Sequence, residues 1–203
     1  RFIRGIREAG VVVGAEKDPE ASMWLNPQSW SVISGFASKE QSDKAMQSVA
    51  DILDTPYGAK LLDPPYIDHY FDGALMHIFN PDTKENGGIF SQSQGWLILA
   101  ESLLGHGDDA FRYFEESSPA SMNDKAEQRV LEPYVHGQFT ESTASPYAGR
   151  SHVHWLTGTA STVMVGCVEG ICGMRPDADG LHICPSIPAA WDGFTMEKLF
   201  RGK

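Results

Sequence analysis

Residues 152–160, His-Val-His-Trp-Leu-Thr-Gly-Thr-Ala, gather the side chains of this sequence that are best suited to chemistry. Two imidazoles, an indole, two hydroxyls and a glycine stand just ahead of the apolar run 163–171. If that run is helical, Thr157 and Thr159 lie at its start, where free backbone N–H groups bind anions. The neighbouring rings suit a sugar, so the run indicates a phosphate site beside a carbohydrate. Either threonine as a plain helix N-cap is the simpler interpretation, and the two are compatible.

Two further polar segments are candidates for a binding site. Residues 84–88, Lys-Glu-Asn-Gly-Gly, carry a cation, a carboxylate and an amide, although their spacing alone favours an ordinary solvated turn. Gln92 and Gln94 fall where a helix should begin, and they can either cap that helix or bind a ligand. His136 and Glu141 belong to a second polar patch, in which His136 could equally be a core histidine bonded to a backbone carbonyl.

Helices are expected to position these groups, because apolar residues recur at helical spacing along much of the chain. In the first helix Trp30 belongs to the expected buried stripe, and Ser38 with Gln41 resembles a capping box for the second. Gly105 is the expected C-terminal cap of the third. The predicted helices cover residues 28–36, 38–53, 93–104, 108–114 and 124–131, and a last one follows Thr159 and ends near Gly173.

The remaining segments read as strands and loops. Residues 1–13 suggest a short hairpin, and residues 59–91 are rich in turn formers, as functional loops are. Asp179-Gly180 is a turn signal, and residues 194–200 alternate as a strand would. A boundary near residue 175 would therefore separate a mainly α domain, residues 1–175, from the start of a β domain, residues 176–203. The helices form either a bundle or an α/α barrel, which periodicity cannot distinguish.

Composition narrows the class of protein. The 203 residues carry a net charge of −11, which argues against nucleic acid as a partner, because phosphate backbones need clustered Lys and Arg. Three sparse cysteines favour a reducing cytoplasm, and Cys167 and Cys172 fit buried small residues better than a metal pair. No segment approaches the ~20 apolar residues of a membrane span, and no signal peptide is evident. Both chain ends suggest a piece of a longer protein.

A set of motifs, spread from about Trp24 to the C-terminus, resembles one enzyme family. It resembles the inverting glycoside phosphorylases of the cellobiose and chitobiose phosphorylase family, glycoside hydrolase family 94. The motifs are Asn-Gly-Gly-Ile-Phe at 86–90, Trp-Leu-Thr-Gly-Thr-Ala at 155–160, Gly-Met-Arg-Pro at 173–176, Asp-Gly-Leu at 179–181, and Pro-Ser-Ile-Pro at 185–188 followed by Trp191.

The resemblance implies both a fold and a reaction. The family has an N-terminal β-sandwich, a helical linker, an (α/α)6 barrel and a C-terminal jelly-roll-like domain. This chain would be the latter half of the barrel and the first strands of the last domain. The reaction is reversible phosphorolysis of a β-glucoside such as cellobionic acid or cellobiose, which gives α-glucose 1-phosphate and an acceptor. The family needs no metal or cofactor, phosphate is a substrate, and the full-length protein is expected to be a homodimer.

Phosphate-binding residues are carried over from the family by position. Thr157 and Gly158 match its phosphate-binding Thr-Gly, and Gln138 matches a phosphate-binding glutamine. Gln92 stands where the family usually has a histidine; an amide can donate a hydrogen bond to phosphate but carries no charge. The family's general acid, an aspartate, and a phosphate-binding arginine have no match in residues 1–203. The isolated chain is therefore expected to be inactive.

Substrate-binding residues are assigned in the same way. Lys84 matches a lysine of the acceptor subsite, Phe79 stands where many members have tyrosine, and Glu85 joins this set without being given the role of the acid. The basic segment 149–154 places Arg150 and His152 where an acidic acceptor such as gluconate would need them, as in the cellobionic acid phosphorylases.

Several alternatives remain open. Arg150 could simply pair with Glu141, itself counted among the substrate-binding residues, or with another barrel carboxylate, and this is as good an interpretation as acceptor binding. The protein could be a non-catalytic carbohydrate-binding helical scaffold. It could also be a family member with another acceptor, as for chitobiose, a cellodextrin or a β-1,2-glucan.

Overall fold

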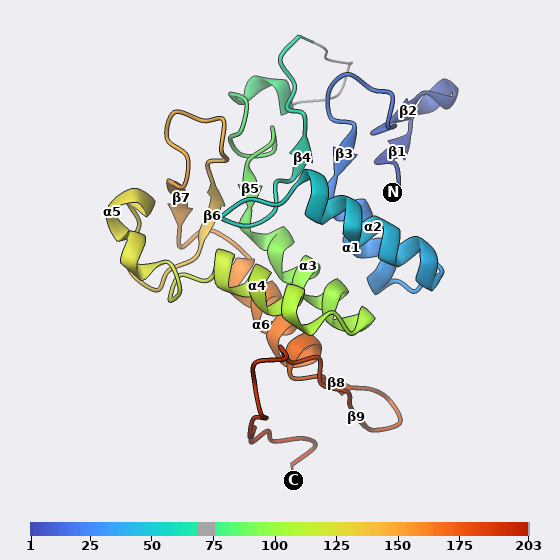
Figure 1. The fold of residues 1–203 in the computed structure, drawn as a ribbon, viewed down its shortest axis with the longest axis vertical. Coiled ribbons are helices and arrows are strands. Elements are labelled where there is room, and N and C mark those ends of the chain that lie inside the picture. The colour runs from blue at the N-terminus through green and yellow to red at the C-terminus, as the bar shows by residue number, and fades with distance from the viewer. Residues whose placement is uncertain (69–75, 203) are drawn as a thin grey trace.

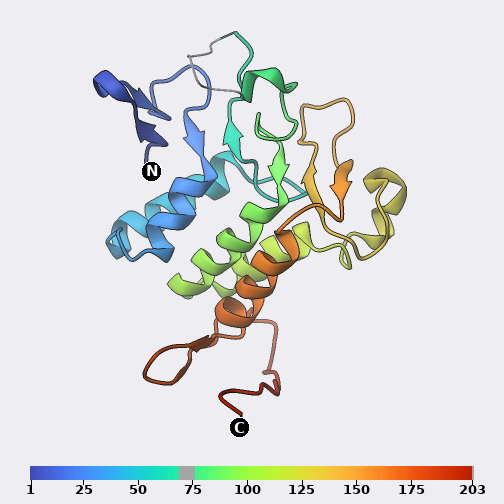
Figure 2. The same ribbon diagram turned by 180° about the vertical axis from the view of Figure 1, so that it is seen from behind.

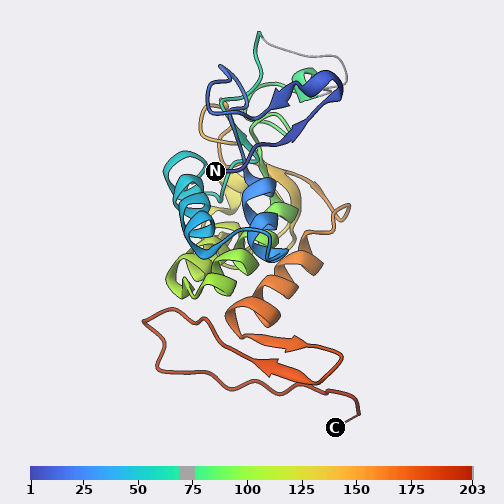
Figure 3. The same cartoon turned by 90° about the vertical axis from the view of Figure 1, so that its right-hand side faces the viewer.

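A computed structural model describes residues 1–68 and 76–202 of the chain. The described residues form three tiers: loops with small sheets at one end, a layer of helices in the middle, and a β-hairpin at the other end (Figures 1 and 3). Six α-helices are described: α1 (Leu25–Ile33), α2 (Lys39–Ile52), α3 (Ser91–Leu104), α4 (Gly107–Ser117), α5 (Ala126–Arg129) and α6 (Thr159–Val165), which runs on as a π-helical segment, Gly166–Ile171.

All the sheets are small and antiparallel. Strand β5 lies directly before α3, and β7 comes shortly before α6, so the three-stranded sheet β5-β6-β7 stands above the starts of both helices (Figure 1). The strands are β1 (Gly5–Ile6), β2 (Val12–Val13), β3 (Met23–Trp24), β4 (Leu62–Asp63), β5 (Ile89–Phe90), β6 (Gly137–Thr140), β7 (Ser151–His154), β8 (Met174–Pro176) and β9 (Leu181–Ile183). They pair as β1-β2, β3-β4, β5-β6-β7 and β8-β9.

The predicted helices are present, with shifted ends. The capping box of Ser38 and Gln41 is confirmed at the start of α2, and Gly105 ends α3 in a left-handed conformation with φ of 83°. The prediction for Trp30 is wrong, because its side chain is 45% exposed. Helix α1 begins at Leu25, earlier than predicted, and it turns Leu25 and Val32 inward, while Trp30 packs edge-on against Trp96 with ring centroids 5.5 Å apart.

The strand predictions are likewise confirmed in some segments and wrong in another. The N-terminal hairpin is confirmed by β1 and β2, and the turn at Asp179-Gly180 joins β8 to β9. Residues 194–200 form no strand, since nothing among the described residues pairs with them, and Leu199 is 79% exposed. The segment 59–91 holds β4 and β5, and its residues 69–75 lie outside the described part. The barrel, the jelly-roll-like domain and the boundary near residue 175 stay predictions.

Helix α3 is the centre of the helical layer, with α1, α4 and α6 packed around it (Figure 2). Gly95 lets α6 come this close, because a Cβ built there would lie 2.3 Å from the backbone carbon of Thr162. Gly166 does the same from the α6 side, where a Cβ would lie 2.8 Å from the carbonyl oxygen of Gly95. No helix in the described residues is long and apolar enough to span a bilayer.

The contact between α3 and α6 gives the first testable prediction. Gly95→Ala should lower the free energy of unfolding by about 1–3 kcal/mol, because overpacking against the Thr162 backbone exceeds the ~1 kcal/mol that alanine gains in a helix. Urea unfolding followed by circular dichroism measures this. Gly5→Ala is the control, since its Cβ would meet nothing within 4 Å. Equal stability of Gly95→Ala and the wild type would contradict the prediction.

Candidate functional site

The loop that carries Lys84 and Glu85 is built around a buried amide. Asn86 is fully buried; its Oδ1 accepts the Tyr66 N–H at 2.7 Å, and its Nδ2 donates to the carbonyls of Tyr66 and Phe79, both at 2.9 Å. The prediction of an ordinary solvated turn at residues 84–88 is therefore wrong. The side chain of Asn86 is buried and pairs with the backbone of Tyr66, as a neighbouring strand would. The Lys84 ammonium lies 5.0 Å from the centroid of the Phe79 ring, so the structure brings these two predicted substrate residues together.

Glu85 lines a cavity of about 250 Å3 between the β3–α1 segment and the start of α3. Its Oε2 atom and the Oδ1 atom of Asn26 are buried and have no hydrogen-bond partner among the described residues. Buried acceptors are normally hydrogen-bonded, so these two atoms are exceptions among the described residues. Three of the ten lining residues, Trp24, Phe90 and Trp96, are aromatic, and such rings suit the flat faces of a sugar. The lining residues are Arg4, Trp24, Asn26, Leu61, Met76, Glu85, Phe90, Gln92, Ser93 and Trp96.

Gln92 joins this cavity to the start of α6. A Cβ built on Gly158 would lie 3.5 Å from both Cδ and Nε2 of Gln92, so the amide faces this glycine at a distance that would just admit a methyl group. The link is fixed by the Thr162 hydroxyl, which donates to the Gln92 carbonyl at 3.0 Å. The structure therefore brings together two groups that were assigned to phosphate from distant parts of the sequence.

The hydroxyls of the Thr157-Gly158-Thr159 segment order the start of α6. Thr157 Oγ1 accepts the Thr159 N–H at 3.2 Å and lies 2.6 Å from Thr159 Oγ1. Thr159 Oγ1 also approaches the Gly137 carbonyl at 3.5 Å, which places the neighbouring Gln138 of β6 near the same helix start. An amide, a hydroxyl and the backbone N–H groups of a helix start are the donors that an anion needs.

Glu141 and His152 form a second, separate pair on the β5-β6-β7 sheet. His152 Nε2 lies 2.6 Å from Glu141 Oε1, and its ring stacks on Phe139 with centroids 4.9 Å apart and an interplanar angle of 12°. Ser145 donates to the other oxygen of Glu141, so both oxygens of this buried carboxylate are engaged.

The predicted alternative that Arg150 pairs with Glu141 is therefore wrong. The carboxylate of Glu141 is already taken by His152 and Ser145. The Arg150 guanidinium lies 5.6 Å from the centroid of the exposed Tyr147 ring instead. No carboxylate within the described residues forms an ion pair with it, which leaves its charge available to a ligand.

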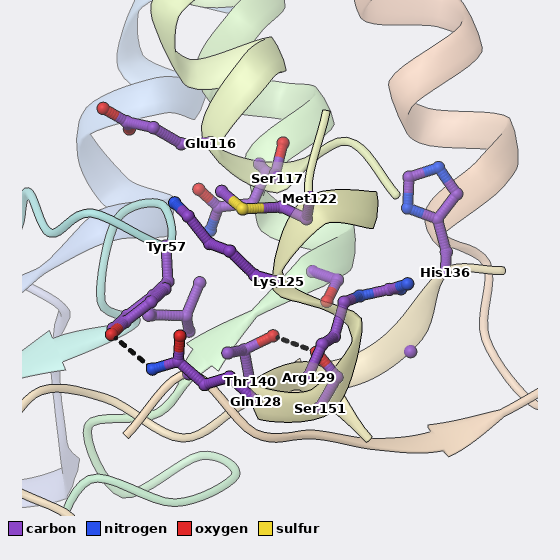
Figure 4. A pocket seen from close by; sticks show the side chains of 15 residues that line it. Tyr57, Glu116, Ser117, Met122, Lys125, Gln128, Arg129, His136, Thr140 and Ser151 are labelled. Carbon is purple, nitrogen blue, oxygen red and sulfur yellow. Dashed lines mark hydrogen bonds between the residues drawn. The ribbon is translucent and has the colours of Figure 1, made fainter. Parts of the chain in front are cut away.

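A hollow on the other side of β5 is distinct from this site (Figure 4). Along β5 and the start of α3, Ile89 and Ser91 line the hollow, whereas Phe90 and Gln92 line the cavity described above. The hollow offers only about 30 Å3, room for a water or two rather than a sugar. His136 lines it, and burial together with the nearby Arg129 lowers the pKa of this imidazole. The structure thus places His136 apart from Gln92 and Gly158.

Part of the cavity wall could not be predicted from the sequence. Arg4, Asn26 and Trp96 come from three separate segments, and only the fold brings them together. In the sequence, Trp96 is one of several apolar residues in the predicted helix 93–104. Asn26 becomes notable only once its buried Oδ1 atom is seen to lack a partner.

The two glutamines at the start of α3 have different roles, and this can be tested. Gln94 is fully buried; it accepts the Ala59 N–H and donates to the Ala59 carbonyl, both at 2.9 Å. Gln94→Leu should lower the free energy of unfolding by at least about 2 kcal/mol, because each buried unpaired group costs about 1–3 kcal/mol. Gln92→Leu, the matched control, should change it by less than about 0.5 kcal/mol. Urea unfolding measures the free energy of unfolding of each variant. Equal losses of stability in both variants would refute the difference in role between the two glutamines.

Comparison with known proteins gives a consistent result. The chain is 35% identical to an N,N'-diacetylchitobiose phosphorylase of Vibrio furnissii and 35% identical to a cellobionic acid phosphorylase of Neurospora crassa. It is 30% identical to a solabiose phosphorylase of Paenibacillus borealis. Each match covers 99% of this chain but only 25–26% of the relative, so the chain spans about a quarter of their length. Residues 1–173 match the catalytic domain of the glycosyl hydrolase 94 superfamily, and the chain belongs to this family.

Proposed function

We propose that this chain supplies the phosphate-binding and acceptor-binding wall of a glycoside phosphorylase. The observation that carries the proposal is the close approach of Gln92 to Gly158, beside Thr157 and next to a cavity lined by Glu85 and Trp96. The reaction would be reversible, inverting phosphorolysis of a β-glucoside such as cellobionic acid or cellobiose. The phosphorylases among its relatives support this class of reaction.

The chemistry explains why donors are needed here. In an inverting glycosidase, one carboxylic acid protonates the leaving oxygen and a second carboxylate activates water on the opposite face of the sugar. Phosphate is already a nucleophile, so the second carboxylate is unnecessary. A phosphate oxygen bonds to C1 as the glycosidic C1–O bond breaks, and the proton goes to the departing acceptor oxygen. Gln92, Thr157 and Gly158 would orient the phosphate and offset its negative charge.

The proton donor in this proposal is not one of the carboxylates of the site. Both oxygens of Glu141 are engaged by neighbouring side chains, and Glu85 fits a role as an acceptor of sugar hydroxyls. The family resemblance assigns the acid to an aspartate that has no match in residues 1–203. The residues of this chain therefore bind and orient both substrates, and they do not transfer the proton.

The acceptor proposed is an aldonic acid such as gluconate. The guanidinium of Arg150 forms no ion pair with a carboxylate of the described residues. Arg150 lies in the connection between β6 and β7, which also holds Glu141, the partner of His152. A guanidinium binds a carboxylate in a bidentate way, whereas a neutral sugar gains much less from its charge. The relatives are named for different disaccharides, so the sugars bound at this site differ within the family.

The phosphate assignment is tested with Thr157→Val in the full-length protein. Removing one oriented group from a site of developing charge should lower kcat/KM for phosphate by about 10²–10³-fold, with little change in stability. Release of α-glucose 1-phosphate from cellobionic acid and cellobiose measures this at varied phosphate. Thr195→Val, at an exposed position, is the control. Unchanged kinetics in Thr157→Val would sink the assignment, and no activity of the wild type on any β-glucoside would favour a non-catalytic scaffold.

The acceptor assignment is tested with Arg150→Gln in the synthetic direction. Phosphate release from α-glucose 1-phosphate should fall at least about 10-fold with gluconate as acceptor, corresponding to one charged hydrogen bond of about 1.5–3 kcal/mol. With glucose it should stay within about 2-fold, because a neutral acceptor lacks the carboxylate. Lys198→Gln removes an exposed positive charge elsewhere and serves as control. Equal losses with both acceptors would show that Arg150 does not choose the acceptor.

A further inference from the structure

A cluster of potential metal ligands lies at the junction of α3 and α4, at the end of α3 away from Gln92 (Figure 1). Glu101 comes from the last turns of α3, His106 stands directly before α4, and Asp109 lies in the first turn of α4. One ligand atom from each of the three lies within 4.8 Å of the others. Asp43 of α2 faces the opposite side of the imidazole, with Oδ1 3.8 Å from His106 Nε2.

The imidazole of His106 lies between two carboxylates. Its Nδ1 atom lies 2.7 Å from Glu101 Oε2, the distance of a direct hydrogen bond from an imidazole N–H to a carboxylate. Its Nε2 atom lies 3.8 Å from Asp43 Oδ1, which is too far for a direct hydrogen bond. A metal ion bound to Nδ1 and Glu101 would take the place of the proton between them. Water has little access to Glu101, which is only 3% exposed.

We propose that Glu101, His106 and Asp109 bind a divalent transition-metal ion such as Zn²⁺ or Mn²⁺. An imidazole and two carboxylates are ligands that these ions accept, and Zn²⁺ sites commonly mix the two types. Asp43 lies on the Nε2 side of the ring, where metal-bound histidines almost always have a carboxylate or carbonyl partner. A hollow of about 280 Å3, lined partly by Asp43, Met46 and Gln47, leaves room for water as the remaining ligand.

The neighbouring cations do not already fill this role. Arg112 lies 3.3 Å from Asp109 Oδ1, and the Lys39 ammonium lies 2.9 Å from Asp43, so each approaches a carboxylate at the edge of the cluster. No lysine or arginine among the described residues forms an ion pair with Glu101, the buried member.

The ion would act as a brace and not as part of the reaction. It would join the end of α3 to the start of α4 and, through His106, to Asp43 of α2. Glu101 follows Gln92 by nine residues, which is about 13 Å along a helix axis. The same helix therefore carries the proposed metal at one end and the proposed phosphate site at the other.

The test is metal binding by the intact, chelator-treated protein without added histidines. Isothermal titration with ZnCl2 and with MnCl2 should show one site, and addition of the bound ion should raise the Tm. His106→Gln should weaken binding at least about 100-fold and abolish the rise in Tm. His182→Gln is the matched control. His182 Nε2 also lies close to an aspartate, 3.3 Å from Asp177 Oδ2, but this pair is on an exposed hairpin.

A second variant guards against a folding defect in His106→Gln. Asp109 is 53% exposed, so Asp109→Asn should leave the fold intact and still weaken binding at least about 10-fold. Lack of stoichiometric binding by the wild type would overturn the proposal and leave His106 as a hydrogen-bond partner of Glu101. Equal binding by the wild type and Asp109→Asn would also overturn it. Because the readouts are binding and Tm, the result is independent of whether the phosphorylase proposal holds.

Discussion

The close approach of α3 and α6 at Gly95 is the constraint on which the arrangement of the site depends. Without a side chain at Gly95, the backbone of Thr162 can lie against α3, and its hydroxyl reaches the Gln92 carbonyl. Gln92 lies one turn before Gly95 on α3, and Gly158 lies one turn before Thr162 of α6. The same contact therefore determines how closely Gln92 approaches Gly158. Any residue larger than glycine would separate the helices and, with them, the two halves of the proposed anion site.

Buried amide side chains hold the loops of the upper tier in a common way. Gln28 bonds both the N–H and the carbonyl of Phe2, Gln94 does so for Ala59, and Asn86 does so for Tyr66. Each amide offers one acceptor and donor N–H groups, as a peptide unit does, so it pairs with a backbone as another strand would. This explains how a region with only short strands can still hold side chains in fixed positions around a cavity.

The sequence predicted what depends on local spacing and missed what depends on distant partners. The capping box at Ser38, the left-handed end at Gly105 and the turn at Asp179-Gly180 are decided by residues a few positions apart, and all are confirmed. The strand at 194–200 failed, because alternation creates a strand only where a partner exists. Family resemblance brought Gln92, Thr157 and Gly158 into one set. Periodicity could not have done so, since their contact arises from the packing of two helices.

The glutamine at position 92 has a consequence beyond its place in the fold. A histidine there would gain and lose a proton near neutral pH, whereas an amide does not titrate. The amide of Gln92, the hydroxyl of Thr157 and the N–H groups at the start of α6 keep the same charge across the physiological range. With phosphate bound there as proposed, this wall of the site would hold the ligand by fixed dipoles alone, and its response to acidity would be that of the phosphate itself.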